Sequence, residues 1–155
     1  MKKNLLLKLC IIPVVIATDI ITKIVLWGKN YPFLKGFISI HSVDLNEGAA
    51  WNILDGHTWV LILISLIFLV FLVLFDLKYK SDSILYNIGF SMIVGGAVGN
   101  LIDRIFLGGV RDFLLFDFWT DFPVFNMADA FLCVGVVLFA IFLIFFFSDK
   151  PKEGK

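Results

Sequence analysis

The stretch PVFNMADAF, from Pro123 to Phe131, opens the last apolar run of the chain, DAFLCVGVVLFAIFLIFFF. A run of this kind can cross a bilayer as a helix, which takes about 20 apolar residues. Yet an amide and a carboxylate, Asn126 and Asp129, stand three residues apart at its start. A carboxylate that enters hydrocarbon costs several kcal/mol on most scales, so Asp129 is by default a candidate for function.

The composition places the chain among integral membrane proteins. Of its 155 residues, 60% are hydrophobic and 16% are aromatic, whereas soluble domains contain about 45–50% apolar residues. The formal net charge is zero, so the chain lacks the basic field that attracts nucleic acid. We therefore expect membrane lipid, and no nucleic acid, as a binding partner.

Four apolar runs have about the length that a membrane-spanning helix needs, and they cover 5–27, 59–75, 84–106 and 124–147. The first run resembles a secretory signal peptide, but no convincing small-x-small cleavage site precedes Asp19, which favours an uncleaved first helix. The runs predict an all-α membrane protein with four transmembrane helices in a single integral membrane domain, 1–155.

Lysine and arginine are distributed unequally between the segments that flank these runs. One side would hold only Lys29, Lys35 and Arg111, and the other Lys2, Lys3, Lys8, Lys78, Lys80, Lys150, Lys152 and Lys155. Because positive residues stay on the cytoplasmic side, both termini, the loop 76–83 and the tail 148–155 are predicted to be cytoplasmic. The loops 28–58 and 107–123 then face outward.

The two outer loops have patterns of their own. GFISIHSVDL, at 36–45, alternates loosely between apolar and polar residues, which predicts a strand that rests on the membrane surface. DFLLFDFWTDFP, at 112–123, mixes aromatic residues with acids, which is typical of an interfacial element.

Three of the predicted helices carry polar residues near their outer ends. At a rise of about 1.5 Å per residue, Asp19, Asn100 and Asp129 lie about 9–12 Å inside the outer ends of their runs. Further polar residues share their faces at helical spacing, namely Thr22, Lys23, Asp103, Arg104 and Asn126. The three helices therefore place polar groups in one layer below the outer surface.

Small residues precede the polar cluster of the third run. Gly95 and Gly99 form a GxxxG arrangement, and Gly96 lies one turn before Asn100. Small residues let a partner helix approach closely in a membrane. We expect close approach on the face that carries the polar cluster, although simple helix packing explains the glycines equally well.

The charged residues of this layer have two interpretations. Structural ion pairs, such as Asp19 with Lys23 or Asp103 with Arg104, explain most buried charges. Asp129, however, has no cation within a helical turn. Asp112 is the other acid without an evident partner, and together the two carboxylates could share one proton. Sharing raises one pKa and leaves the other low, as general acid and base work on a water requires.

Five ordered motifs carry a resemblance to a known family. They are DIITK at 19–23, NEGAAW at 46–51, GGAVGNLIDR at 95–104, VRDF at 110–113 and FNMAD at 125–129. In this order the chain resembles lipoprotein signal peptidase, the signal peptidase II family, over nearly its whole length. Three positions depart from the pattern of the family, namely Ile20, Leu45 and Ala130.

The resemblance implies roles for particular residues. Asp112 and Asp129 correspond to the catalytic aspartates of an intramembrane aspartyl protease. The residues that orient this dyad and bind the substrate would be Asn46, Asn100, Arg104 and Asn126. Supporting roles would fall to Asp19, Lys23, Asp103 and Gly48. The family also has a small β-sheet cradle in its first outer loop, in agreement with the strand predicted above.

The resemblance further implies a reaction. An endopeptidase of this kind removes the signal peptide from diacylglyceryl-modified prolipoproteins at the outer face of the bacterial cytoplasmic (inner) membrane. Cleavage falls just before the lipidated cysteine. The implied chemistry activates water with the aspartate dyad and needs no metal or other cofactor, and no obligate protein partner is implied.

Two other functions are compatible with intramembrane acids. One is a proton-coupled transporter or channel subunit, since such acids also serve as relays, but the polar residues stop near one face. The other is a metal-dependent lipid-headgroup transferase that would use Asp103, Asp112 and Asp117. His41 and His57 fall in loops, and their spacing does not match a zinc site.

Overall fold

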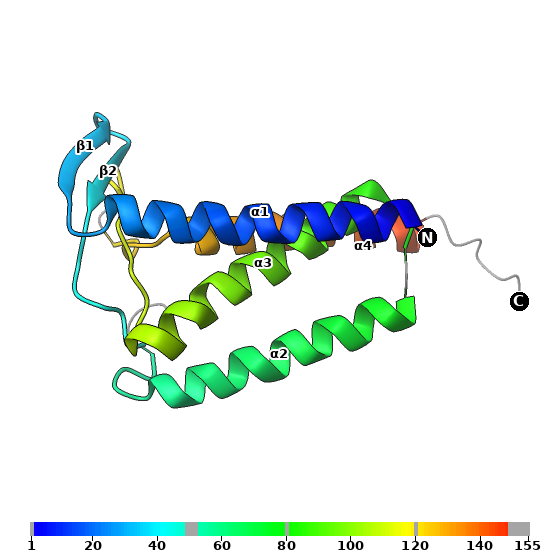
Figure 1. The fold of residues 1–155 in the computed structure, drawn as a ribbon. Coiled ribbons are helices and arrows are strands. Elements are labelled where there is room, and N and C mark those ends of the chain that lie inside the picture. Colours follow the sequence, from blue (N-terminus) through cyan, green and yellow to red (C-terminus); the bar gives the residue numbers. More distant parts are fainter. Residues whose placement is uncertain (1, 49–52, 80, 120, 149–155) are drawn as a thin grey trace, which may run out of the picture.

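The computed structural model describes residues 2–48, 53–79, 81–119 and 121–148 (Figure 1). Along the chain the elements are α1 (Lys2–Leu26), β1 (Asn30–Leu34), β2 (Ile38–His41), α2 (Thr58–Tyr79), α3 (Ile84–Leu107), β3 (Leu114–Phe116) and α4 (Met127–Ser148). The AAW part of the NEGAAW motif, Lys80 and the tail from residue 149 lie outside the described residues.

In the described part of the chain, four helices are long and apolar enough to cross a membrane, which confirms the predicted fold class. Their bounds differ from the apolar runs by a few residues. At the starts, α1 begins at Lys2 rather than at residue 5, and α4 begins at Met127 rather than at residue 124. The start of α4 bears on the site. The reason is local, because the side chain of Asn126 caps this helix and so ends the loop before it.

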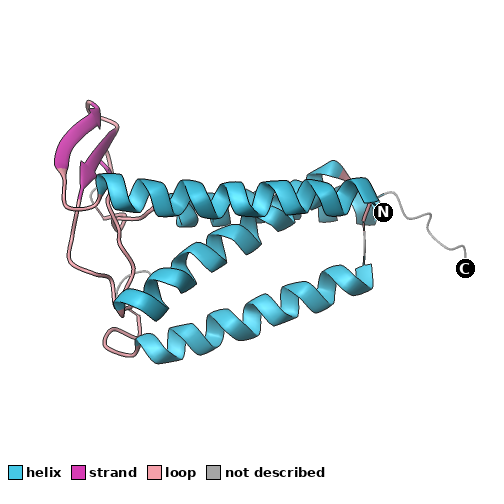
Figure 2. Cartoon of the chain, viewed as in Figure 1, coloured by secondary structure: helices cyan, strands magenta, loops and turns pink. Residues whose placement is uncertain are grey.

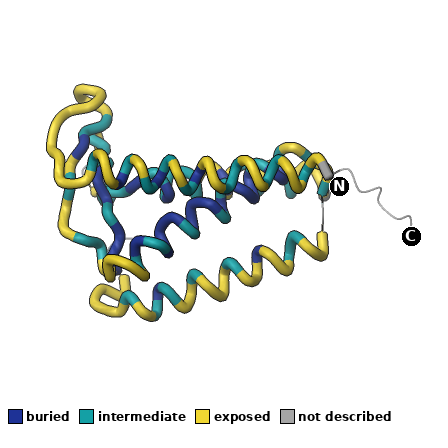
Figure 3. Tube along the Cα trace, viewed as in Figure 1, coloured by how far each residue is buried: buried dark blue, intermediate teal, exposed yellow. Residues whose placement is uncertain are grey.

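The third helix is the centre of the bundle. Of its most apolar window, 67% of the residues are buried, against 17% in α1, 11% in α2 and 6% in α4 (Figure 3). It packs most extensively against α4 and α1. Gly89 of α3 faces Gly135 of α4 so closely that a Cβ on Gly89 would lie 2.9 Å from the Gly135 carbonyl oxygen. Larger residues at this crossing would force the two helices apart.

The strands form one antiparallel sheet in the order β1-β2-β3. In the pairing of β2 with β3, Ile38 lies opposite Phe116 and Ile40 opposite Leu114. The sequence predicted a sheet within the first loop, and the structure adds a third strand from the second loop. The predicted interfacial element is therefore partly a strand, with a cluster of aromatic rings around Phe116.

The strands lie together at one end of the bundle, which we call the sheet end (Figure 2). The N-terminal end of α1 and the C-terminal end of α4 lie at the opposite end (Figure 1). At the sheet end α3 stops at Gly108, whose positive φ of 79° ends the helix and turns the chain into the segment before β3. This segment brings Arg111 back to Asp103 of α3 and brings Asp112 to Asn126, next to the start of α4.

The opposite end is joined by aromatic packing and by polar contacts to Asp76. Tyr86, Phe90 and Leu72 are buried there, with the partly buried Phe139 and Phe142 packed against them. Lys8 of α1 forms an ion pair with Asp76 of α2. The Tyr86 hydroxyl of α3 donates to the same carboxylate at 2.9 Å. One acid therefore connects three helices at this end.

Candidate active site

The spacing of Asn126 and Asp129 has a direct structural explanation. Asn126 is the N-cap of α4, and its Oδ1 accepts a hydrogen bond from the Asp129 backbone N–H at 3.1 Å. In return the Asp129 Oδ2 accepts from the Asn126 backbone N–H, also at 3.1 Å. This reciprocal pair is a capping box, which satisfies two N–H groups at the start of a helix. It also fixes the Asp129 carboxylate at the first turn of α4.

Asp112 reaches the same place from the segment between α3 and β3. Its Oδ1 accepts from the Asn126 Nδ2 at 2.7 Å. The backbone holds it there, because the Phe113 N–H donates to the Phe125 carbonyl oxygen at 3.0 Å. Asn126 thus contacts both acids, Asp112 through its side-chain amide and Asp129 through the capping box.

The first loop supplies another amide. Asn46 pairs with Val110 through two backbone hydrogen bonds of 2.9 Å. This pairing aligns the two loops and brings the Asn46 Nδ2 to 2.9 Å from the Asp112 Oδ2. Both oxygens of Asp112 therefore accept a hydrogen bond from an asparagine amide.

Asn100 connects the acids to the interior of the bundle. Its Nδ2 donates to the Asp129 Oδ1 at 2.7 Å. Its Oδ1 accepts from the Asn126 Nδ2 and from the Lys23 ammonium, each at 3.0 Å. Asp129 thus also accepts one hydrogen bond at each oxygen, and the cation that it lacks within its own helix is reached through Asn100.

Behind Asn100 lies a buried set of charges. Lys23 is fully buried and lies 2.8 Å from Asp19 and 3.5 Å from Asp103. The predicted pairing of Asp19 with Lys23 is confirmed. The predicted pairing of Asp103 with Arg104 is wrong, because both oxygens of Asp103 accept from Arg111, with a shortest distance of 2.7 Å. The turn at Gly108 and Gly109 brings Arg111 back onto α3.

Asp19 has a second contact that holds two helices together. Its Oδ1 accepts from the Ala128 backbone N–H at 2.9 Å, so a residue of α1 caps the first turn of α4. Gly99 of α3 leaves the necessary room, because a Cβ there would lie 2.5 Å from the Asp19 Oδ2. The predicted close approach at the polar cluster is confirmed at this glycine.

Arg104 is arranged differently from the other cations. Its Nη2 donates to the Gly48 carbonyl oxygen at 3.0 Å. Its Nε is buried and has no hydrogen-bond partner among the described residues. A buried guanidinium N–H without a partner is costly, so this donor is available to a ligand with a carbonyl oxygen.

The environment of Asp112 changes its acidity. Burial raises the pKa of Asp112 from 3.8 to about 6, because the ionised form is poorly solvated there. Negative charge on Asp129 raises it further, while the amides of Asn46 and Asn126 oppose the change by donating to the carboxylate. An acid in this state can exchange a proton near neutral pH.

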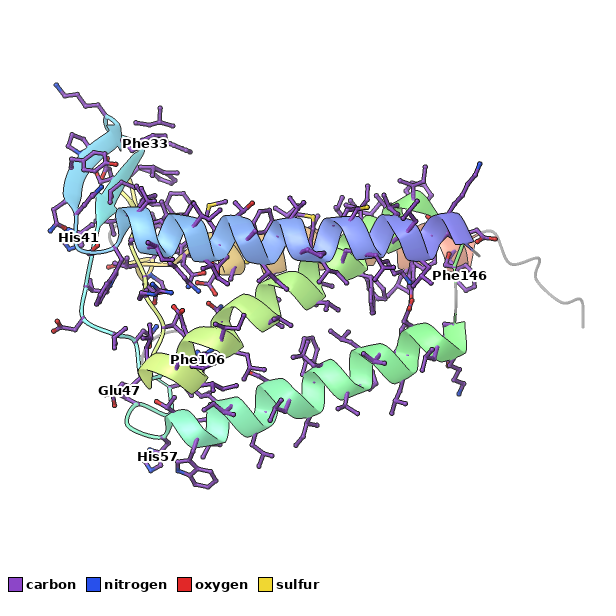
Figure 4. The ribbon with its side chains drawn as sticks, in the orientation of Figure 1. Phe33, His41, Glu47, His57, Phe106 and Phe146 are labelled. Carbon is purple, nitrogen blue, oxygen red and sulfur yellow. The ribbon has the colours of Figure 1, made fainter. Side chains whose placement is uncertain are left out.

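Several candidates lie apart from this cluster. His41 and His57 are exposed on separate segments at the sheet end (Figure 4). Asp117 lies beyond β3, where its backbone N–H donates to the Phe37 carbonyl oxygen. Among the described residues no three His, Cys, Asp or Glu side chains are grouped so that they could hold a metal ion. The metal-dependent alternative therefore has no assembled site in this part of the chain.

One residue of the cluster was missed from the sequence. The sequence suggested Arg104 as the partner of Asp103, and Arg111 was not identified in that role. The signal was present in the double glycine before it, because a turn at Gly108 lets a residue a few positions later face the end of its own helix.

Comparisons with known proteins agree with this geometry. The family model described as signal peptidase (SPase) II matches residues 11–145. The lipoprotein signal peptidase of Bacillus pumilus (strain SAFR-032) is 39% identical over 136 residues, which cover 87% of this chain and 86% of that protein.

Solved structures extend the likeness to the fold. A "bacterial membrane enzyme structure by the in meso method at 2.3 A resolution" has 34% sequence identity and a TM-score of 0.85, with 96% of this chain and 93% of that chain covered. A similar structure at 1.9 A has 35% identity, a TM-score of 0.79 and coverage of 88% and 92%. The chain is a multi-pass bacterial membrane protein and a peptidase, and it belongs to the signal peptidase II family.

Proposed function

We propose that this chain is an aspartic endopeptidase that removes the signal peptide from diacylglyceryl-modified bacterial prolipoproteins. Cleavage falls just before the lipidated cysteine. The observation that carries the proposal is the position of Asn126, which contacts Asp112 and Asp129 at once. Two acids on one asparagine form a pair that can hold a single proton between them.

The pair supplies both acid and base. The ionised aspartate takes a proton from water as the water oxygen bonds to the scissile carbonyl carbon. The protonated aspartate gives its proton to the carbonyl oxygen, and a neutral gem-diol forms. When the C–N bond breaks, the proton held by the first aspartate moves to the leaving nitrogen. One gem-diol hydroxyl proton returns to the second aspartate, so the pair again holds a single proton. The products are the signal peptide with a new carboxyl group and a lipidated cysteine with a free amine.

Three asparagines position the two carboxylates by hydrogen bonds. Every oxygen of the two carboxylates accepts one hydrogen bond, from Asn46, Asn100, the Asn126 amide or the Asn126 backbone N–H. Amide donors stabilise negative charge without titrating themselves. They therefore keep one charge on the pair and leave its proton free to move.

Arg104, which Gly48 holds in place, would contact the substrate. The Arg104 Nε is a buried donor without a partner among the described residues, and the Gly48 carbonyl oxygen fixes the guanidinium at its other end. A peptide carbonyl close to the scissile bond would satisfy this donor. Binding of the substrate backbone by Arg104 follows from this arrangement.

The orientation in the membrane is part of the proposal. Both termini would be cytoplasmic and the sheet end would face outward, because lysines are concentrated near the opposite end. A diacylglyceryl group would hold the substrate cysteine at the outer membrane interface, at the depth of the aspartate pair. In a background without native cysteines, Lys35→Cys should react with an impermeant thiol reagent from outside, and Lys78→Cys should not. Labelling of position 78 from outside would reverse the orientation.

The reaction is tested with purified protein and a lipid-modified prolipoprotein. Asp112→Asn and Asp129→Asn should each abolish cleavage, because an amide cannot exchange the required proton. Asp121→Asn is the matched control, since Asp121 is an exposed acid between β3 and α4, and it should cleave normally. Activity should persist in EDTA, whereas a metal-dependent transferase would lose it. Full cleavage by Asp129→Asn would overturn the proposed role of the pair.

A further inference from the structure

The charged groups around the aspartate pair are unequal in number. The described residues of this layer include four acids and three cations, and they are Asp19, Asp103, Asp112, Asp129, Lys23, Arg104 and Arg111. If all were ionised, the layer would carry one excess negative charge. A poorly hydrated layer disfavours net charge, and one proton on one acid makes it neutral.

The two acids behind the pair each contact a cation directly. Asp19 lies 2.8 Å from Lys23, and Asp103 accepts two hydrogen bonds from the Arg111 side chain. Direct contact with a cation favours the ionised form of an acid. Asp112 and Asp129 accept mainly from neutral amides. The proton that balances the layer therefore resides on the pair.

We propose that Lys23, charge-balanced by Asp19, sets the number of protons on the aspartate pair and fixes the direction of the hydrogen bonds that reach it. Lys23 is thus a positioning residue that acts through Asn100 and through its charge, without touching the substrate. This inference rests on the proposed function, because it concerns the protonation of the proposed catalytic pair.

The contacts of Lys23 support the directional role. Its ammonium is fully buried, donates hydrogen bonds to Asp19 and Asn100, and lies 3.5 Å from Asp103. Asn100 is the neutral partner among them. Since an ammonium can only donate, the Asn100 oxygen must face Lys23 and the Asn100 NH₂ must face Asp129. Without Lys23, the described contacts that would hold this amide in the productive orientation are those with Asn126 and with Asp129 itself.

The charge of Lys23 also acts on Asp112. Lys23 lowers the pKa of Asp112 and so opposes the increase caused by burial and by Asp129. The charged groups that face the pair come from every element around it: Asp19 and Lys23 from α1, Asp103 and Arg104 from α3, and Arg111 from the segment after α3. Lys23 alone among these cations contacts an amide that binds the pair directly.

Charge-changing variants should move the pH–rate profile in opposite directions. Lys23→Met removes a cation, so a neutral layer then needs two protons on the pair. Both limbs of the pH–rate profile should therefore move to higher pH. Asp19→Asn removes an anion, so a neutral layer needs no proton on the pair, and both limbs should move to lower pH. Shifts of about one pH unit are expected for charges at this range. The double variant Lys23→Met/Asp19→Asn restores balance, and its limbs should return to the wild-type positions.

The experiment is a pH profile of kcat/KM for the purified full chain with a lipid-modified prolipoprotein. Lys23→Arg is the control that keeps the charge, and its limbs should stay in place even if its rate falls. A merely structural role for Lys23 would lower the rate of each variant at every pH, with unmoved limbs and no return in the double variant. The inference would be overturned if the limbs of the single variants did not move, or if those of the double variant did not return to the wild-type positions.

Two further provisions separate the possible failures. If Lys23→Met does not accumulate in the membrane, Asp103→Asn joins Asp19→Asn as an anion-removing variant, and both must shift the limbs to lower pH for the inference to stand. Asp112→Asn is assayed in parallel. If it still cleaves, the proposed function fails. If it is inactive while the charge variants leave the limbs in place, only the role of Lys23 fails.

Discussion

The two ends of the helix bundle are held together by different chemistry. At the sheet end, α1, α3 and α4 meet through buried asparagines, acids and cations around Asn100. At the opposite end α3 and α4 meet through aromatic rings around Tyr86, and Lys8 of α1 pairs with Asp76 of α2. Buried polar groups contribute little net stability. We infer that the opposite end stabilises the bundle, while the sheet end is arranged for chemistry.

The largest expected effect separates activity from stability at the sheet end. Asp112→Asn should lower kcat by about 10³-fold or more, as expected for loss of a general acid or base. The double variant with Asp129→Asn should have a kcat no lower than that of either single variant. A double variant far less active than both singles would show that the two acids do not act as one unit.

Asp112→Asn should increase the stability of the protein although it decreases its activity. Because the pKa of Asp112 rises from 3.8 to about 6 on folding, the protonated acid stabilises the fold below pH 3.8, and this contribution is lost as the pH rises through 6. The loss amounts to about 3 kcal/mol. Asp112→Asn lacks this dependence, so its Tm in detergent should exceed that of the wild type by more at pH 7.5 than at pH 4.5. An equal Tm difference at both pH values would contradict the shifted pKa.

The next effect compares two tight glycines. A Cβ at Gly99 would meet the Asp19 carboxylate at 2.5 Å, and a Cβ at Gly89 would meet the Gly135 carbonyl oxygen at 2.9 Å. Gly99→Ala and Gly89→Ala should each destabilise the protein by about 1–3 kcal/mol. Only Gly99→Ala should lower the activity per folded molecule, because it displaces Asp19 from Ala128 and Lys23. Equal losses of specific activity would remove the distinction between the two ends.

A smaller effect concerns two arginines of the sheet end. Arg104→Ala should raise KM by about tenfold or more, because the loss of a hydrogen bond between a charged group and the substrate weakens binding by about that factor. It should change Tm little. Arg111→Ala should instead lower Tm, because it leaves Asp103 without its side-chain hydrogen bonds from Arg111. Substrate titrations and thermal unfolding in detergent separate the two. A large Tm loss in Arg104→Ala would show that this residue serves the fold.

The smallest effect lies at the opposite end. Tyr86→Phe removes the hydroxyl that donates to Asp76 and keeps the buried ring. It should cost about 1 kcal/mol of stability and leave kcat and KM unchanged. A change in either kinetic constant would show that the two ends are coupled.

Local spacing made several features predictable from the sequence alone. The apolar runs predicted four helices because a helix in lipid needs about 20 apolar residues to satisfy its backbone. The spacing of Asp19 and Lys23 put them within reach on one helix face. The three-residue interval between Asn126 and Asp129 is that of a capping box, so the amide and the acid at the start of α4 belong together before any other helix is present.

Contacts between segments distant in the chain were decided only by the tertiary structure. Asp103 pairs with Arg111 rather than with its neighbour Arg104, because the turn after α3 reverses the chain. β3 joins strands from another loop, and Asp19 caps a helix more than one hundred residues later. Periodicity describes one element at a time. How a buried donor is satisfied depends on which acceptors the packing brings near it, and that is a property of the whole bundle.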